Sequence, residues 1–183
     1  MIYNFADLKT RVKDVEEWLK RENSQIRTGR ASIGLLDFIR VDSYGSLVPL
    51  NQVAGLATED PRTIRISPWD TSQVKEIEKV LVASDLGVSV SVDDRGVRVA
   101  FPPLTTERRD EFVKLAKTKL EQAKVSLRKH RDEIWEDIQA KEEEGGMGED
   151  EKFRFKAEME KIIQDTVKNL EAMCKKKEDE IMN

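Results

Sequence analysis

The sequence is poor in the residues that build disulfide frameworks and metal centres. Its 183 residues include one cysteine and one histidine, so an internal disulfide is excluded and a site of several Cys and His ligands is not expected. No run approaches the ~20 apolar residues that cross a bilayer. Charges begin at Asp7, which leaves no hydrophobic segment of a secretory signal. We therefore expect a cytoplasmic protein with no cofactor, metal or membrane contact.

Aromatic residues are also scarce, at 6%, whereas charged residues reach 37% and exceed the ~25% of ordinary domains. Long amphipathic helices with wide solvated faces give such proportions. The net charge of −4 conceals a segregation, because residues 108–131 carry nine basic and three acidic side chains and residues 132–151 carry one and ten. Charge runs usually mark a solvated face, but this one also allows a localised contact with RNA.

Three segments show the three/four spacing of apolar residues that predicts amphipathic helices, namely residues 4–27, 105–144 and 150–183. A glycine-rich turn at 145–148 separates the last two, and Thr105 is a suitable N-cap for the second. Each apolar stripe needs a partner, because an isolated stripe does not offset the entropy lost on ordering the chain. The three helices are therefore expected to pack as one bundle.

The segment between the first two helices has the texture of a small α+β unit. Turn residues punctuate short β-type runs, including 63–66 and a hairpin of 88–92 with 97–101. An amphipathic helix is predicted at about 73–84. The chain is thus expected to be an α+β protein, an elongated three-helix bundle that carries an inserted β/α/β domain.

Two connecting segments divide the predicted domains. The bundle is expected to comprise residues 1–29 and 105–183, and the inserted domain residues 30–104. Glycine gives the first segment backbone freedom, and consecutive prolines stiffen the second. This pairing predicts a hinge with a directed motion. Its residues are Gly29, Arg30, Pro102, Pro103 and Thr105.

The sequence gives little support to an enzyme. It has no phosphate-binding glycine loop, no GxSxG and no HExxH. His130 falls on the apolar side of the second long helix, between Leu127 and Ile134, and is interpreted as a seam residue rather than a catalytic base. Cys174 lies beside the seam of the last helix and is interpreted as a small hydrophobe. We predict no catalytic residues.

A basic stripe on the second long helix is the stronger functional candidate. At ~100° per residue, Lys117, Lys124, Arg128 and Arg131 fall within about sixty degrees of one another. Guanidinium forks suit phosphate oxygens, and Trp135, expected to be exposed one turn on, suits a base or sugar. Basic residues that flank a bundle seam also simply cover its edge with their stems. The spacing leaves both interpretations open.

Short motifs occur in one order along nearly the whole chain. They are Arg27-Thr28-Gly29-Arg30-Ala31-Ser32, Leu35-Leu36-Asp37, Tyr44-Gly45, Pro49-Leu50, Ala83-Ser84-Asp85-Leu86-Gly87, and Pro102-Pro103-Leu104-Thr105 with Glu107-Arg108-Arg109. This ordered set resembles the bacterial ribosome recycling factor family. The resemblance implies the same bundle with an inserted domain, in an L shape whose outline is similar to transfer RNA.

The resemblance also implies a monomeric translation factor with no reaction of its own. Such a factor binds large-subunit ribosomal RNA after peptide release. With elongation factor G, which hydrolyses GTP, it splits the subunits and releases messenger and deacylated transfer RNA. By position, Arg128 and Arg131 match the RNA-binding arginines of the family, with Lys117 and Lys124 beside them. Asp132 stands where the family usually has another basic residue.

Two rival hypotheses remain at this stage. The same helices suit a helical-bundle protein-interaction or chaperone-like module that grips a protein client. That hypothesis predicts an exposed apolar groove and no salt-dependent affinity for RNA. An enzyme built around His130 is the third alternative.

Overall fold

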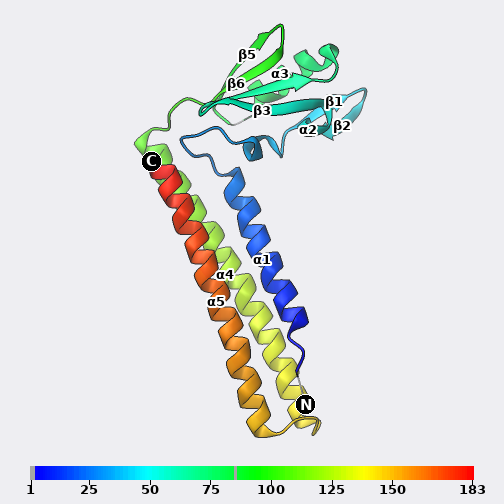
Figure 1. The fold of residues 1–183 in the computed structure, drawn as a ribbon, viewed down its shortest axis with the longest axis vertical. Coiled ribbons are helices and arrows are strands. Elements are labelled where there is room, and N and C mark those ends of the chain that lie inside the picture. Colours follow the sequence, from blue (N-terminus) through cyan, green and yellow to red (C-terminus); the bar gives the residue numbers. More distant parts are fainter. Residues whose placement is uncertain (1–2, 85) are drawn as a thin grey trace. The chain divides into compact units, whose positions relative to one another are not determined.

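The chain folds as an α+β protein, as predicted. A computed structural model describes residues 3–84 and 86–183, so Asp85 of the motif at 83–87 lies outside the described residues. Two compact units are distinguished (Figure 1). The first contains the chain up to Asn23 together with Lys114–Glu178, and the second contains Ser24–Val113 and Asp179–Asn183.

The larger parts of three helices build the first unit: α1 (Ala6–Gln25), α4 (Thr106–Glu143) and α5 (Glu149–Met182). They lie side by side in Figure 1. The apolar stripes read from the sequence form its core, because burying them removes their surface from water. Fully buried members are Leu8, Leu19, Ala123, Leu127, Ile138, Met159 and Leu170. On α5, Ile163 and Cys174 are buried, whereas Ile162 and Met173 are only partly covered. Cys174 therefore lies in the seam of α5 rather than beside it.

The ends of the helices follow local capping. Asn4 Oδ1 accepts the N–H of Ala6 at 2.9 Å and starts α1 two residues later than predicted. That helix ends at Gln25, two residues before the predicted end, and Gly29 is not among the glycines with a positive φ that commonly follow a helix. Thr105 Oγ1 accepts the N–H of Arg108 at 3.3 Å, which confirms the predicted N-cap of α4.

The second unit is organised around an antiparallel sheet in the order β3-β4-β6-β5. Its strands are β3 (Ala54–Asp60), β4 (Thr63–Pro68), β5 (Ser89–Asp93) and β6 (Gly96–Ala100). The helix α3 (Val74–Ala83) follows the short 3-10 helix η2 (Thr71–Gln73). The predicted β5–β6 hairpin and the helix at 73–84 are confirmed.

The first residue of β6, Gly96, is a position that requires glycine. Its φ is +126°, and a Cβ there would lie 2.3 Å from the main-chain oxygen of Ile66 on β4. Only glycine lets β6 approach β4 so closely.

A second hairpin was not anticipated from the sequence. It pairs β1 (Arg40–Ser43) with β2 (Ser46–Pro49) and is followed by the short helix α2 (Leu50–Val53). Its turn places Tyr44 at φ 53° and Gly45 at φ 83°, the backbone of a tight two-residue turn. A 3-10 helix, η1 (Ile33–Leu36), precedes it. The core of the unit comprises Leu35, Leu36, Ile39, Val41, Leu50, Ala54, Ile64, Ile66, Ile77, Leu81, Val97, Val99 and Phe101.

A network of charges lies on one face of the sheet. Both terminal nitrogens of Arg65 donate to Asp93, at 2.9 and 3.0 Å, and Arg98 Nε donates to Glu59 at 2.9 Å. The hydrogen bonds from Arg65 lower the pKa of the Asp93 carboxyl to about 2. The carboxylate form of Asp93 is therefore favoured in the folded unit.

Candidate nucleic-acid interface

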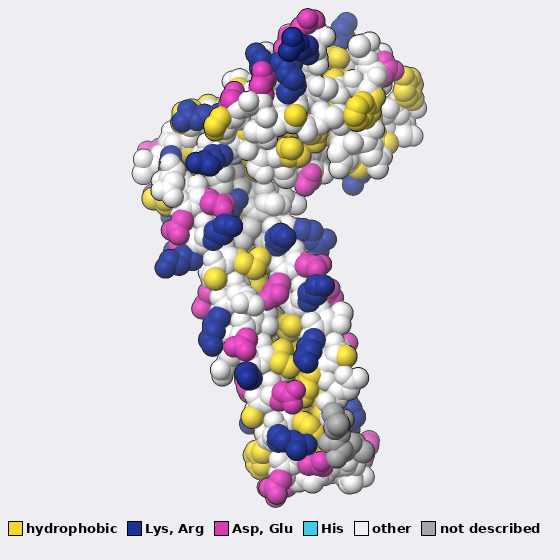
Figure 2. All heavy atoms as spheres, viewed as in Figure 1, with side chains coloured by type: hydrophobic (Ala, Val, Ile, Leu, Met, Phe, Trp, Pro, Cys, Tyr) yellow, Lys and Arg dark blue, Asp and Glu magenta, His cyan; other side chains and the backbone are white. Residues whose placement is uncertain are grey.

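The basic stripe lies on α4, a 38-residue helix without an interruption. Lys117 and Arg128 are exposed, and the Lys124 and Arg131 side chains are 24% and 37% exposed. A rigid helix holds such groups at fixed spacing, which is the arrangement needed to match the regular charges of a nucleic-acid backbone. Figure 2 shows basic and acidic side chains interspersed along this unit rather than a purely basic surface.

Three of the four stripe cations are paired with carboxylates. On α5, Glu171 Oε1 lies 2.8 Å from Lys124 Nζ, and Glu178 Oε1 lies 3.5 Å from Lys117 Nζ. Arg131 pairs instead with its sequence neighbour, donating from Nε and Nη2 to Asp132 Oδ1 at 3.0 and 2.7 Å.

The pairing has electrostatic consequences. The hydrogen bond to Glu171 raises the pKa of Lys124, and the hydrogen bond to Asp132 raises the pKa of Arg131. Both groups therefore stay charged near neutral pH. A phosphate that binds either cation takes the place of a carboxylate, and surface pairs of this kind contribute only ~0–1 kcal/mol.

Arg128 differs from the other three. Among the described residues no carboxylate pairs with it, and its Nε donates only to the carbonyl of Lys124, at 3.4 Å. It can bind a phosphate without first releasing an acid. The sequence did not distinguish Arg128 from its neighbours, because the carboxylates on α5 lie more than forty residues away along the chain.

Trp135 is not the exposed stacking platform that the sequence suggested. It is partly buried against the bundle core. Lys152 and Lys156 of α5 lie 5.9 and 4.8 Å from its ring centre, in cation–π arrangement. Because α5 covers the ring, Trp135 stabilises the helix pair instead of facing a base.

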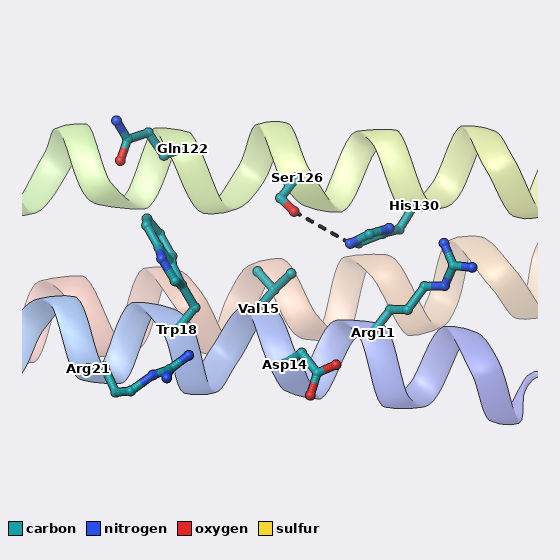
Figure 3. Close-up of a pocket in the computed structure, with 8 residues that line it drawn as sticks. All are labelled: Arg11, Asp14, Val15, Trp18, Arg21, Gln122, Ser126 and His130. Atoms are coloured by element: carbon teal, nitrogen blue, oxygen red, sulfur yellow. Dashed lines mark hydrogen bonds between the residues drawn. The ribbon is translucent and has the colours of Figure 1, made fainter.

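His130 lies at the edge of the seam and lines a groove between α1 and α4 (Figure 3). Its Nε2 is 3.5 Å from Ser126 Oγ, and its Nδ1 is 3.6 Å from a Glu133 carboxylate oxygen. The first distance exceeds the ~2.6–3.2 Å that links a nucleophile to its base. Trp18 and Val15 share the groove with charged and polar side chains. The lining of this groove is therefore mixed in character.

Two other site types receive no support within the described ranges. No group of three or more His, Cys, Asp or Glu side chains there could hold a metal ion. No helix there is both long enough and apolar enough to span a bilayer. Cys174 is buried, and burial raises the pKa of its thiol.

The two connecting segments meet at one turn of the sheet. The N–H of Ala31 donates to the carbonyl of Pro61 at 2.8 Å, and the N–H of Phe101 donates to the carbonyl of Arg62 at 2.7 Å. Gly29 lies before the first of these contacts, and a Cβ built on it would meet no atom within 4 Å. Side chains at position 29 are therefore not excluded by contact.

Of the other predicted hinge residues, Arg30 and Pro103 are exposed, and the N–H of Arg30 donates to Thr28 Oγ1 at 3.3 Å. The carbonyl of Pro102 accepts a hydrogen bond from Nη2 of Arg27. Arg27 thereby joins the two connecting segments, a role that the sequence did not reveal. In the sequence Arg27 was only the first residue of a motif, at the end of the predicted helix.

Comparisons with known proteins bear on the chain as a whole. A family model described as "Ribosome recycling factor" matches residues 19–182. The chain belongs to the ribosome recycling factor family. Relatives described as "Ribosome-recycling factor" include one from Syntrophobacter fumaroxidans, 39% identical with 97% of this chain and 96% of the relative covered. Another from Zymomonas mobilis is 40% identical, with 98% and 97% covered.

Solved structures of the ribosome recycling factor agree with this assignment. A solution structure of the factor matches with a TM-score of 0.75 and 35% identity, covering 100% of this chain and 99% of that one. A second match has a TM-score of 0.68 and 34% identity, with 98% and 97% covered. It comes from models for the T. thermophilus ribosome recycling factor and the E. coli elongation factor G bound to the E. coli post-termination complex.

Family membership confirms the recognition made from the ordered motifs. Ribosome recycling factors are non-enzymatic translation factors, so the chain is not an enzyme. The hypothesis of an enzyme built around His130 is thereby removed. The assignment also favours translation over the chaperone-like alternative.

Proposed function

We propose that this chain binds the ribosome after peptide release and, together with elongation factor G, separates the two subunits. Messenger RNA and deacylated transfer RNA then leave. Elongation factor G hydrolyses GTP and supplies the energy, while this chain transmits force as a monomer in the cytoplasm. The observation that carries the proposal is the family match over residues 19–182. The structure of a relative together with elongation factor G on a post-termination complex supports the choice of partner.

The contact with large-subunit ribosomal RNA is assigned to the basic stripe on α4, formed by Lys117, Lys124, Arg128 and Arg131. The exposure of Arg128 and the exchangeable carboxylate partners of the other three support this assignment. Neutralising phosphates releases condensed counterions, so binding by this stripe weakens as salt concentration rises.

The proposal also assigns the mechanical roles within the chain. Residues 1–29 and 105–183 act as one domain, and residues 30–104 act as the other. The hinge consists of Gly29 and Arg30 in one segment and Pro102, Pro103 and Thr105 in the other. The N-cap of Thr105 fixes the start of α4, so Thr105 is the last residue of the hinge on that side.

A splitting assay tests the proposal directly. Post-termination ribosomes are mixed with the protein, elongation factor G and GTP, and subunit separation is followed by light scattering. We expect separation only when all three are present. Light scattering that stays constant with all three components, although the protein co-sediments with ribosomes, would contradict the proposed function.

A further inference from the structure

Arg27 occupies an unusual position for a cation. It follows α1 by two residues, and its Nη1 donates to the carbonyls of Leu86 and Gly87 at 3.0 and 3.2 Å. Its Nη2 donates to the carbonyl of Pro102, and its guanidinium carbon lies 5.5 Å from the ring centre of Phe101. One side chain thus connects the segment after α1, the loop before β5 and the segment after β6.

The partners of Arg27 are all uncharged. Burial lowers the pKa of its guanidinium, and its buried Nε has no hydrogen-bond partner among the described residues. A partly buried charge held by neutral acceptors keeps part of its desolvation cost. The three carbonyls therefore hold the Arg27 guanidinium in one position. Once these hydrogen bonds break, water can solvate the guanidinium in their place.

The residues beyond Arg27 show what these contacts restrain. Ala31 and Phe101 are fixed by main-chain hydrogen bonds to the turn at Pro61 and Arg62. The segment Thr28–Arg30 therefore runs between two attached points. While Arg27 stays in place, rotations at Gly29 only rearrange this short loop and cannot move its ends.

We propose that Arg27 is a positioning residue that ties the two connecting segments together and must release its carbonyl partners before the hinge can bend. An arginine suits this role because its planar fork presents several donors at once, whereas a lysine presents a compact ammonium. The importance of this tie on the ribosome rests on the proposed function. The tie itself belongs to the free protein.

The first test uses the free full-length chain. Cysteines replace Ser91 and Ala157 in a Cys174→Ala background, and single-molecule energy transfer between dyes on them gives a distribution of distances. Both labelled sites are exposed. Arg27→Gln, which cannot bond all three carbonyls, should broaden this distribution, and Arg27→Lys should broaden it less.

The matched control is Arg95→Gln. Arg95 is an exposed arginine in the β5–β6 turn, so this variant loses the same charge in the same unit without touching the Arg27 contacts. Its distribution should equal that of the parent. Thermal unfolding of each variant establishes that it is folded. An unchanged width in both folded Arg27 variants would overturn the proposal.

The second test separates positioning from binding. With Arg27→Gln we expect unchanged affinity for vacant ribosomes. The splitting rate should rise by about tenfold, because the hinge of this variant bends without first releasing a hydrogen bond to a charged group. A broadened distribution with an unchanged splitting rate would refute the positioning role. Failure of the unmodified chain to split ribosomes would instead refute the proposed function, and the result on the free protein would stand.

Discussion

Replacing Arg128 with alanine tests the RNA interface at its most informative residue. Arg128 is exposed and has no carboxylate partner among the described residues, so it meets a phosphate at no cost in broken ion pairs. A hydrogen bond to a charged group contributes ~1.5–3 kcal/mol, which corresponds to a loss of affinity of about 10- to 150-fold. The bundle should stay folded, because Arg128 bonds only to its own helix.

Arg131→Ala should cost less than Arg128→Ala. Arg131 must first leave Asp132, with which it makes bonds of 2.7 and 3.0 Å. Breaking an exposed ion pair of this kind costs ~0–1 kcal/mol, which reduces the binding free energy that Arg131 gains from a phosphate. The structure thus predicts an order of effects that the sequence pattern alone did not.

Labelled protein titrated against vacant ribosomes at several salt concentrations measures both quantities. Removing one cation that neutralises a phosphate should flatten the dependence of log affinity on log salt by about 0.7–0.9. Lys129→Ala is the matched control, since this lysine on α4 is 76% exposed and lies outside the stripe. Wild-type affinity and salt slope in a folded Arg128→Ala variant would refute the stripe as the RNA contact.

Three further predictions follow from the charges and the packing. Glu171→Gln should remove the nearer carboxylate partner of Lys124, leaving Glu121 at 3.7 Å, and strengthen ribosome binding by up to about fivefold, whereas Glu158→Gln on the same helix should not change the affinity measured in the same titration. Gly96→Ala forces a methyl group within 2.3 Å of a carbonyl oxygen of β4 and should lower the free energy of unfolding in urea by more than ~3 kcal/mol; wild-type stability would contradict the close approach. Because the pKa of Asp93 is lower in the folded than in the unfolded chain, its carboxylate stabilises the fold fully above the unfolded pKa of ~3.9. This stabilisation is lost as pH falls toward about 2. In acid unfolding, the stability of Asp93→Asn should therefore lack this part of the pH dependence.

The parts of the fold that depend on local pattern were predictable. The long helices carry an apolar residue every three or four positions, and burial of that face decides their structure regardless of detail. The β5–β6 hairpin was equally readable, since alternating valines flank a turn that ends in Gly96. The β1–β2 hairpin escaped because its turn begins with Tyr44, a residue that rarely takes a left-handed conformation.

The parts of the site that depend on tertiary pairing were not predictable. The sequence placed Lys124 and Arg128 on one face of a helix, but the acids that neutralise Lys124 and spare Arg128 belong to the packing of α5 on α4. The covering of Trp135 has the same origin. Arg27 was visible only as part of a motif, because its acceptors are main-chain carbonyls, which every sequence supplies.

The turn at Pro61 and Arg62 has a consequence for how this chain is assembled. The carbonyls of these two consecutive residues accept hydrogen bonds from Ala31, at the beginning of the inserted stretch, and from Phe101, at its end. The polypeptide between them therefore begins and ends at nearly one place. Closing such a segment on itself requires only a short bridge, and the entropy of loop closure grows slowly with length. The stretch from Ala31 to Phe101 can thus be cut out and joined end to end, or transplanted into another loop, without stretching any strand of its sheet.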